Sequence, residues 1–399
     1  MSPQRVWSAL RGIPVPAWFP STTRCEENVV DVAPDLSRHG PHALIRKYLT
    51  PDVYQALAPL QTVNGVRLED IIRAGITLPW GADPPRGIAG IYAGDAESYQ
   101  VFAPLLDPLI EDYHRAGVRK RGLQRHRTNL NPQSLLQQEL DPEGHYILST
   151  RMRLARSLEG YRFAPCLTRT ERRRIAAILE ECTSSWPGKY RWIKDMSNDE
   201  HDDLIQRAVL FPDPDDFALA AGTHRDWPDG RAIYYHPKES PELIVWVNNE
   251  DHIWIISYAK GGDVQGVFAR LSRAAWSLES ELAVRGHAFV EDRRLGFLNA
   301  SPANIGPALR ASVYVKLVHL GKQPGFGALI HKLRLDARAQ YDEPSGKGYT
   351  GIFHIANAEA LGKSEVDLIN IMIVGVAGLI DIEKRLAQGE EIDLDSIVV

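Results

Sequence analysis

Two arginines lie two positions apart in YILSTRMRLARS, residues 146–157. The stretch reads as a β-strand, and alternate side chains of a strand point to the same face. Arg151 and Arg153 would therefore share one face, where their charges repel each other unless an anion lies between them. A planar guanidinium binds phosphate oxygens in pairs, so the spacing predicts a phosphate clamp. A solvated strand face is the alternative, and the spacing alone leaves it open.

A second candidate site lies at the tip of a predicted hairpin, in WVNNEDHIWIIS, residues 246–257. Apolar runs rich in Val, Ile and Trp flank five polar residues, which is typical of two strands joined by a loop. Glu250 and Asp251 lie at this tip and could face a pocket. A solvated turn is the alternative.

Two further arginines are candidate phosphate-binding residues, and several absent motifs exclude other kinds of active site. Arg310 lies just before the predicted strand ASVYVKL, and Arg338 lies in a polar loop. The sequence has no GxxxxGK[ST], HExxH or GxSxG stretch, and its 13 histidines do not cluster at ligand spacing. A P-loop and a zinc-protease motif are therefore excluded, and no protein-bound metal site is predicted.

Composition excludes further classes of protein. The 399 residues are 44% hydrophobic and 24% charged, with a net charge of −5, so no basic field indicates a nucleic-acid or membrane partner. Three cysteines in so long a chain predict a reducing compartment. The N-terminus lacks a continuous apolar signal segment, and the longest apolar run, 369–380, is shorter than the roughly 20 residues of a membrane span. We expect a cytoplasmic protein.

The elements that must position these side chains fall into four segments. Residues 1–40 read as an irregular arm, 41–117 as a helical N-terminal domain, 118–144 as a polar linker, and 145–399 as a catalytic domain of strands and helices. Successive strands with short connections predict antiparallel pairing. The fold class is therefore α+β, with helices packed on an antiparallel sheet.

Several longer stretches together resemble the phosphagen kinases, the ATP:guanidino phosphotransferases that include arginine kinase and creatine kinase. The matching stretches include GIYAGDAESYQVFAPLLDP (90–108), YILSTRMRLARSLEGY (146–161), VWVNNEDHIWIISYAKGGD (245–263), LGFLNASPANIGPALRASVYVKL (295–317) and FHIANAEALGKSEVD (353–367). The resemblance implies a small helical N-terminal domain and a larger domain with an eight-stranded antiparallel sheet. It also implies ATP, Mg²⁺ and a small-molecule nitrogen acceptor as ligands, with a homodimer among the possible assemblies.

The resemblance assigns roles to single residues. Glu250 matches the carboxylate that faces the acceptor nitrogen, and Glu343 weakly matches a second carboxylate on a closing loop. Trp80 and Asp83 lie in a loop where the family contacts its substrate. The positions that match nucleotide phosphate contacts are Ser149, Arg151, Arg153, Arg310 and Arg338.

The departures from the family pattern are equally specific. Asn249 replaces the first of two adjacent glutamates at the hairpin tip, and Ser301 replaces an active-site cysteine. Trp254 replaces an arginine that holds the nucleotide, and we expect it to be part of the ATP-binding site. Further changes near the expected nucleotide site fall at Ala208, Tyr314 and His354.

These departures leave three hypotheses. The first is an ATP-dependent N-phosphotransferase whose acceptor is a modified guanidine or the amine of an amino acid or short peptide, in a specialised biosynthetic pathway. The second is an arginine- or creatine-type phosphagen kinase. The third is a catalytically silent pseudokinase with a binding role.

Overall fold

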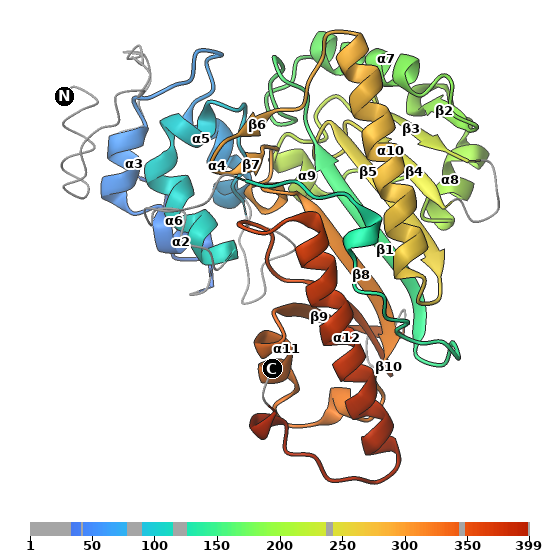
Figure 1. The fold of residues 1–399 in the computed structure, drawn as a ribbon. Coiled ribbons are helices and arrows are strands. Elements are labelled where there is room, and N and C mark those ends of the chain that lie inside the picture. The colour runs from blue at the N-terminus through green and yellow to red at the C-terminus, as the bar shows by residue number, and fades with distance from the viewer. Residues whose placement is uncertain are drawn as a thin grey trace.

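A helical domain forms the N-terminal part of the computed structural model, which describes residues 33–40, 43–77, 90–114, 126–236, 242–342 and 348–397 (Figure 1). Its described helices are α2 (Leu44–Tyr48), α3 (Pro51–Leu57), α4 (Leu68–Thr77), α5 (Ser98–Val101) and α6 (Ala103–His114). Thr50 caps α3 by accepting a hydrogen bond from the Val53 amide, with Pro51 at the first helical position. The helices pack around a buried apolar core that also includes residues of the larger domain, among them Phe163, Leu298 and Ile305.

Helix α4 ends later than its sequence suggests. The sequence predicts a stop at Gly75, but the helix continues to Thr77. Gly75 lies against the backbone of Gly90, whose carbonyl accepts its amide hydrogen at 3.0 Å. A Cβ at Gly75 would lie 2.3 Å from the Ile45 side chain, so this glycine serves close packing rather than helix termination.

An eight-stranded antiparallel sheet forms the larger domain, as expected. Its strand order is β2-β3-β4-β5-β1-β8-β10-β9, and a separate two-stranded hairpin pairs β6 with β7. The strands are β1 (Ile147–Arg156), β2 (Lys189–Trp192), β3 (Ala232–Tyr235), β4 (Leu243–Val247), β5 (Ile253–Lys260), β6 (Glu291–Asp292), β7 (Gly296–Phe297), β8 (Leu309–Lys316), β9 (Leu335–Asp342) and β10 (Gly348–Asn357).

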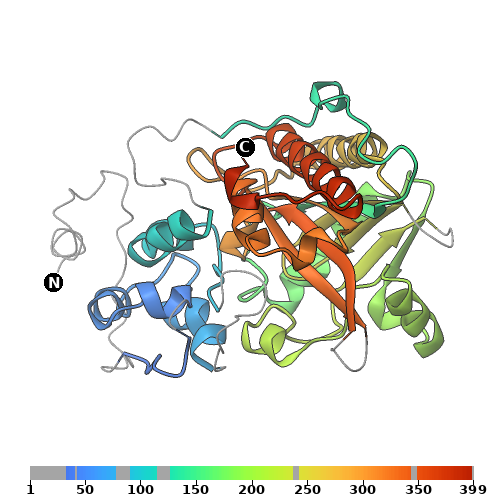
Figure 2. The same ribbon diagram turned by 90° about the horizontal axis from the view of Figure 1, so that it is seen from below.

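Three long helices cover one face of this sheet: α7 (Arg169–Cys182), α10 (Val264–Val284) and α12 (Glu365–Ala387) (Figures 1 and 2). Capping boxes start α7 at Thr168 and α12 at Ser364, where the N-terminal amides would otherwise lack partners. The main apolar core lies between these helices and the sheet. The shorter helices are α8 (Asn198–Gln206), α9 (Asp216–Ala220) and α11 (Phe326–Lys332), and the single 3-10 turns are η1 (Pro132–Ser134), η2 (Ile193–Asp195), η3 (Pro302–Asn304), η4 (Leu320–Lys322) and η5 (Leu394–Ser396).

Residues 126–144, from the predicted linker, run irregularly across the helical face of the catalytic domain. Leu130, Leu135 and Leu140 are buried in the main core, and the Leu136 amide donates to Asn370 of α12 at 2.9 Å. This part of the segment is thus bound to the catalytic domain. The predicted boundaries at 117 and 144 stay predictions.

Two arginines lie in more regular structure than their sequence predicts. Arg310, expected just before a strand, is the second residue of β8, and Arg338, expected in a loop, lies inside β9. Arg338 lies in a strand because β9 pairs with β10, and such cross-strand contacts outweigh the polar character of the stretch.

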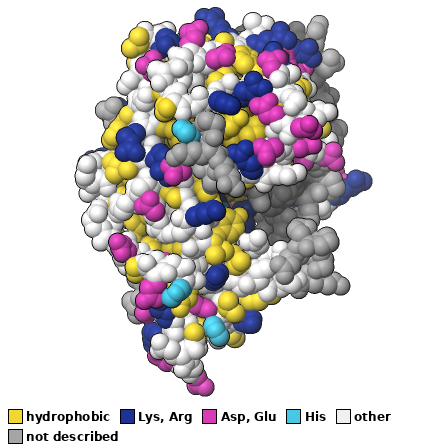
Figure 3. All heavy atoms as spheres, turned by 90° about the vertical axis from the view of Figure 1, so that its right-hand side faces the viewer, with side chains coloured by type: hydrophobic (Ala, Val, Ile, Leu, Met, Phe, Trp, Pro, Cys, Tyr) yellow, Lys and Arg dark blue, Asp and Glu magenta, His cyan; other side chains and the backbone are white. Residues whose placement is uncertain are grey.

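The outside of the molecule carries charges of both signs. On the side shown in Figure 3, Lys and Arg side chains lie among Asp and Glu side chains. No helix in the described part of the chain is long and apolar enough to cross a membrane.

Candidate functional site

The register of the sheet brings the four predicted phosphate-binding arginines to one face. Arg153 of β1 lies directly opposite Arg310 of β8, and Arg338 of β9 pairs with His354 of β10. Arg151 lies two residues before Arg153, on the same side of β1. The intervening residues of β1 contribute to the main core beneath the helices, so the arginines face the opposite side. Ser149 shares this arginine face and pairs with Tyr314.

The arginine face carries more positive than negative charge. Arg310 and Arg338 share one carboxylate, Asp336, at 2.8 and 3.4 Å. Among the described residues, Arg151 and Arg153 form no ion pair. Burial lowers the pKa of Arg153 to about 10, which leaves its guanidinium charged at neutral pH. Such a surplus of guanidinium groups suits a polyphosphate.

The predicted hairpin joins β4 to β5 through residues 248–252. At its tip, Glu250 accepts a hydrogen bond from the Tyr92 hydroxyl at 3.0 Å. Burial raises the pKa of Glu250 to about 7, with the neighbouring Asp251 charge acting in the same direction and Arg153 opposing it. A carboxyl group with such a pKa can accept a proton at neutral pH.

Asp251 turns inward and is fully buried. Its Oδ1 accepts the Ala300 amide at 3.0 Å, and its Oδ2 accepts the Trp254 indole at 2.9 Å and the Asn304 amide group at 2.8 Å. Burial raises the pKa of this carboxyl group. These contacts hold the Asp251 carboxyl group inside the protein, whereas Glu250 remains the candidate base.

Asn249 is bound away from any cationic partner. Its Oδ1 lies 3.0 Å from Nε2 of His224, and burial lowers the pKa of that imidazole to about 4. Both side chains are therefore uncharged at neutral pH. The position adds a polar group to the hairpin tip but no charge.

Ser301 starts the 3-10 turn η3 and is 2% exposed. The preceding residue, Ala300, accepts the Ala93 amide at 2.7 Å, and Asn304 donates to Asp251. The 299–304 segment thus connects the helical domain to the hairpin tip. It places Ser301 beside the site without giving it an ionisable thiol.

Trp254, which stands where the family has an arginine, provides an aromatic surface in place of a positive charge. Its ring stacks on Trp246 with centroids 5.6 Å apart and an interplanar angle of 21°. The Arg153 guanidinium lies over the Trp254 ring, 3.7 Å from its centroid. The structure therefore places Trp254 against Arg153, which is predicted to bind a nucleotide phosphate.

Three predicted site residues, Trp80, Asp83 and Glu343, lie outside the described residues. In the described part of the chain, five further residues contact the site although they were not predicted to: Tyr92, His224, Trp246, Asn304 and Asp336. Tyr92, Trp246 and Asn304 lie in stretches that resemble the family, so their contacts with the site could have been suspected. His224 and Asp336 join the site only through loop packing and sheet register.

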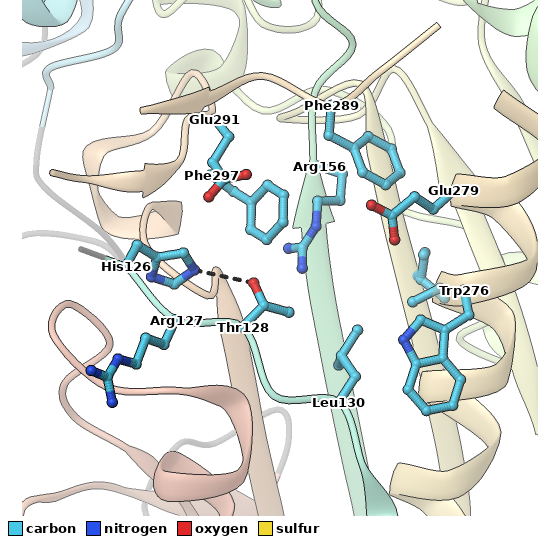
Figure 4. A pocket seen from close by; sticks show the side chains of 12 residues that line it. His126, Arg127, Thr128, Leu130, Arg156, Trp276, Glu279, Phe289, Glu291 and Phe297 are labelled. Atoms are coloured by element: carbon cyan, nitrogen blue, oxygen red, sulfur yellow. Dashed lines mark hydrogen bonds between the residues drawn. The ribbon is translucent and has the colours of Figure 1, made fainter. Parts of the chain in front are cut away.

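A cavity of about 600 Å³ lies on the other, helix-covered side of the sheet (Figure 4). Buried Arg156 lies at its centre, over the ring of Phe297 at 3.6 Å, while Trp276 and Glu279 of α10 form one wall. None of the predicted site residues that the structure describes lines it. The cavity is therefore separate from the arginine face.

An arginine-lined sheet face beside a carboxyl group of raised pKa suits a phosphotransferase. Comparisons with known proteins agree. The C-terminal catalytic domain of ATP:guanido phosphotransferases matches residues 171–386, and the N-terminal domain of the same family matches residues 40–111. The chain belongs to this family, whose members are kinases with a nitrogenous group as acceptor.

Individual relatives cover nearly the whole chain. Creatine kinase M-type from Oryctolagus cuniculus is 38% identical over 366 residues, 90% of this chain and 93% of that protein. Arginine kinase from Anthopleura japonica is 37% identical over 353 residues, 87% of this chain and 47% of that protein. A crystal structure of lombricine kinase superposes with a TM-score of 0.80 at 29% identity, covering 92% of this chain and 99% of that one.

Proposed function

We propose that this protein transfers the γ-phosphoryl group of ATP to a nitrogen of a small molecule that is less cationic than creatine or arginine. A modified guanidine fits this description, as does the unprotonated amine of an amino acid or short peptide, in a specialised biosynthetic pathway. The observation that carries the proposal is the hairpin tip. Asn249 is bound to neutral His224 and Asp251 is turned inward, so Glu250 supplies the acceptor-facing charge of the described tip.

The number of carboxylates at the hairpin tip affects how strongly the site binds a guanidinium group, because that group is a planar cation. At an effective dielectric constant near 20, a charge about 4 Å from a cation contributes roughly 4 kcal/mol. Replacing a tip carboxylate by Asn249 and a thiol by Ser301 therefore weakens recognition of a full cation. A neutral amine needs one base and a shaped pocket, which Glu250 and Tyr92 supply.

The arginine face fits ATP with Mg²⁺. The guanidinium groups of Arg151, Arg153, Arg310 and Arg338 would bind the phosphate oxygens and stabilise charge on the migrating group. Among the described residues, no group of three or more His, Cys, Asp or Glu side chains could hold a metal ion. Mg²⁺ would be bound mainly through the nucleotide phosphates, which is common for this ion, and would neutralise part of their charge.

Glu250 would orient the acceptor nitrogen and remove its proton. As the bond between the γ-phosphorus and the bridging oxygen breaks, the new phosphorus–nitrogen bond forms and the nitrogen proton passes to Glu250. Tyr92 holds the carboxylate in place during this exchange. Phosphoryl transfer depends mainly on such positioning and on charge stabilisation.

A guanidino acceptor is the second candidate, favoured by the 38% identity to creatine kinase over most of both chains. Arginine, creatine, lombricine and taurocyamine are then the compounds to test, because kinases of those names are among the similar proteins.

The experiment incubates the protein with ATP–Mg and one acceptor at a time, and follows new phosphorus–nitrogen signals by ³¹P NMR. The panel contains these guanidines, substituted guanidines, amino acids and dipeptides, with the Glu250→Gln variant as the control. Transfer to an amine or substituted guanidine above transfer to the standard guanidines supports the proposal. Preferred transfer to arginine or creatine establishes the second candidate, and absence of both transfer and ATP binding indicates a pseudokinase.

A further inference from the structure

Four side chains next to the proposed base form a closed ring of contacts. Nη2 of Arg153 donates to Oδ1 of Asn304 at 3.2 Å, and Nδ2 of Asn304 donates to Oδ2 of Asp251 at 2.8 Å. The Trp254 indole donates to the same Oδ2 at 2.9 Å. The ring closes where the Arg153 guanidinium lies over the Trp254 face, 3.7 Å from its centroid.

Trp254 is held firmly enough to act as a support. It is 7% exposed and stacks on Trp246, whose own indole donates to the Val209 carbonyl at 2.6 Å. On β1, Arg151 lies 5.5 Å from the Trp246 ring, so both arginines of this strand lie over one tryptophan each. The two stacked tryptophan rings thus contact the guanidinium groups of both Arg151 and Arg153.

We propose that Trp254 is a positioning residue that fixes Arg153 for catalysis and does not itself bind the nucleotide. This inference rests on the proposed function, because it assumes that Arg153 binds a phosphate group. It replaces the expectation that Trp254 is an ATP ligand. Through Arg153, Trp254 also tunes Glu250, since the Arg153 charge lowers the pKa of that carboxyl group.

Trp254 affects both the conformational order and the charge around Arg153. A long arginine side chain loses conformational freedom when it binds a phosphate, and a preformed contact reduces that loss. Tryptophan gives the strongest cation–π contact among the aromatic side chains and can hold a partly buried guanidinium without adding charge. A second guanidinium at residue 254 would instead repel Arg153.

Three substitutions separate the roles of the indole. Trp254→Phe keeps an aromatic face but removes the N–H donor, Trp254→Leu removes both, and Trp254→Arg introduces a cation. Trp276→Leu is a matched control, because Trp276 of α10 is 45% exposed and lines the cavity on the helix-covered side of the sheet, away from Arg153. ATP–Mg affinity is measured by calorimetry, and the Glu250 pKa by ¹³C NMR of its carboxyl group, assigned with Glu250→Gln.

We expect Trp254→Leu to weaken ATP–Mg binding at least tenfold and to raise the Glu250 pKa, because Arg153 is no longer held in place. Trp254→Phe should restore affinity to within about threefold of the wild type, since the aromatic face remains. Trp254→Arg should bind ATP–Mg more weakly than the wild type.

Tighter ATP–Mg binding by Trp254→Arg would overturn the inference, as would unchanged affinity and unchanged Glu250 pKa in Trp254→Leu. If Trp254→Leu does not fold, the Phe and Arg variants decide the question through the same two measurements. Failure of the wild-type protein to bind ATP–Mg refutes the proposed function instead. The Glu250 pKa then still tests whether Trp254 holds Arg153.

Discussion

The Tyr92 hydroxyl donates a hydrogen bond to Oε1 of Glu250 at 3.0 Å, across 158 positions of the sequence. Tyr92 belongs to the helical domain, where its amide donates to the Ile71 carbonyl of α4. Glu250 belongs to the hairpin of the sheet. The proposed base is thus oriented by the other domain, and its protonation depends on how the two domains meet.

Removing this hydrogen bond should shift the pH dependence of catalysis. The bond stabilises the charged carboxylate and so lowers the pKa of Glu250, which burial has raised to about 7. In Tyr92→Phe the pKa should rise further, and the acid limb of the transfer rate should move to higher pH. Tyr48→Phe is a matched control, because its hydroxyl binds Asp112 away from the hairpin tip. An unchanged acid limb in Tyr92→Phe would show that Tyr92 does not tune the base.

Replacing the base itself should greatly slow transfer while sparing the nucleotide site. Glu250→Gln keeps the size and the hydrogen-bond acceptor for Tyr92 but cannot take a proton. We expect turnover to fall by roughly 10²–10⁴-fold, the usual contribution of a general base, with little change in ATP–Mg affinity. Exposed Glu159 provides the matched Glu→Gln control. Wild-type turnover in Glu250→Gln would remove Glu250 from the mechanism.

The same substitution should stabilise the fold at alkaline pH. The folded pKa of Glu250, about 7, lies above the ordinary value of 4.5, so the folded protein binds the extra proton between these pH values. The free energy of unfolding therefore falls as pH rises through this window. Above pH 7, Glu250→Gln should be more stable than the wild type by up to about 3 kcal/mol, and the difference should vanish below pH 4.5. Urea unfolding at pH 4 and pH 8 measures both values, and an equal difference at the two pH values would contradict the raised pKa.

The arginine face should require guanidinium geometry as well as charge. Arg310→Lys retains the cation but loses the planar fork that binds two oxygens. We expect ATP–Mg affinity to fall about tenfold or more and turnover to fall by roughly 10²–10³-fold. Arg334→Lys is the control, because Arg334 precedes β9 and pairs with Glu359 outside the face. ATP–Mg affinity is measured by calorimetry, together with turnover, for both variants. Equal affinity and equal turnover in the two variants would exclude a specific role for Arg310.

Sequence patterns correctly predicted the features that depend on contacts between residues close together in the chain. The polar tip between two apolar runs determines a hairpin through contacts within a few residues. Period-two spacing likewise placed Arg151 and Arg153 on one face. The resemblance supplied the eight-stranded sheet, because strand order depends on long-range pairing that no single stretch reveals.

The composition of the hairpin tip, with Asn249 before Glu250 and Trp254 shortly after, was evident from the sequence. Only the tertiary structure decided what these residues do. Sheet register brought Arg153 opposite Arg310, loop packing brought Asn304 to Asp251, and the fold of a second domain brought Tyr92 to Glu250. Burial at that meeting point raised the pKa of the base to about 7, and burial is a property of the assembled chain rather than of any residue in it.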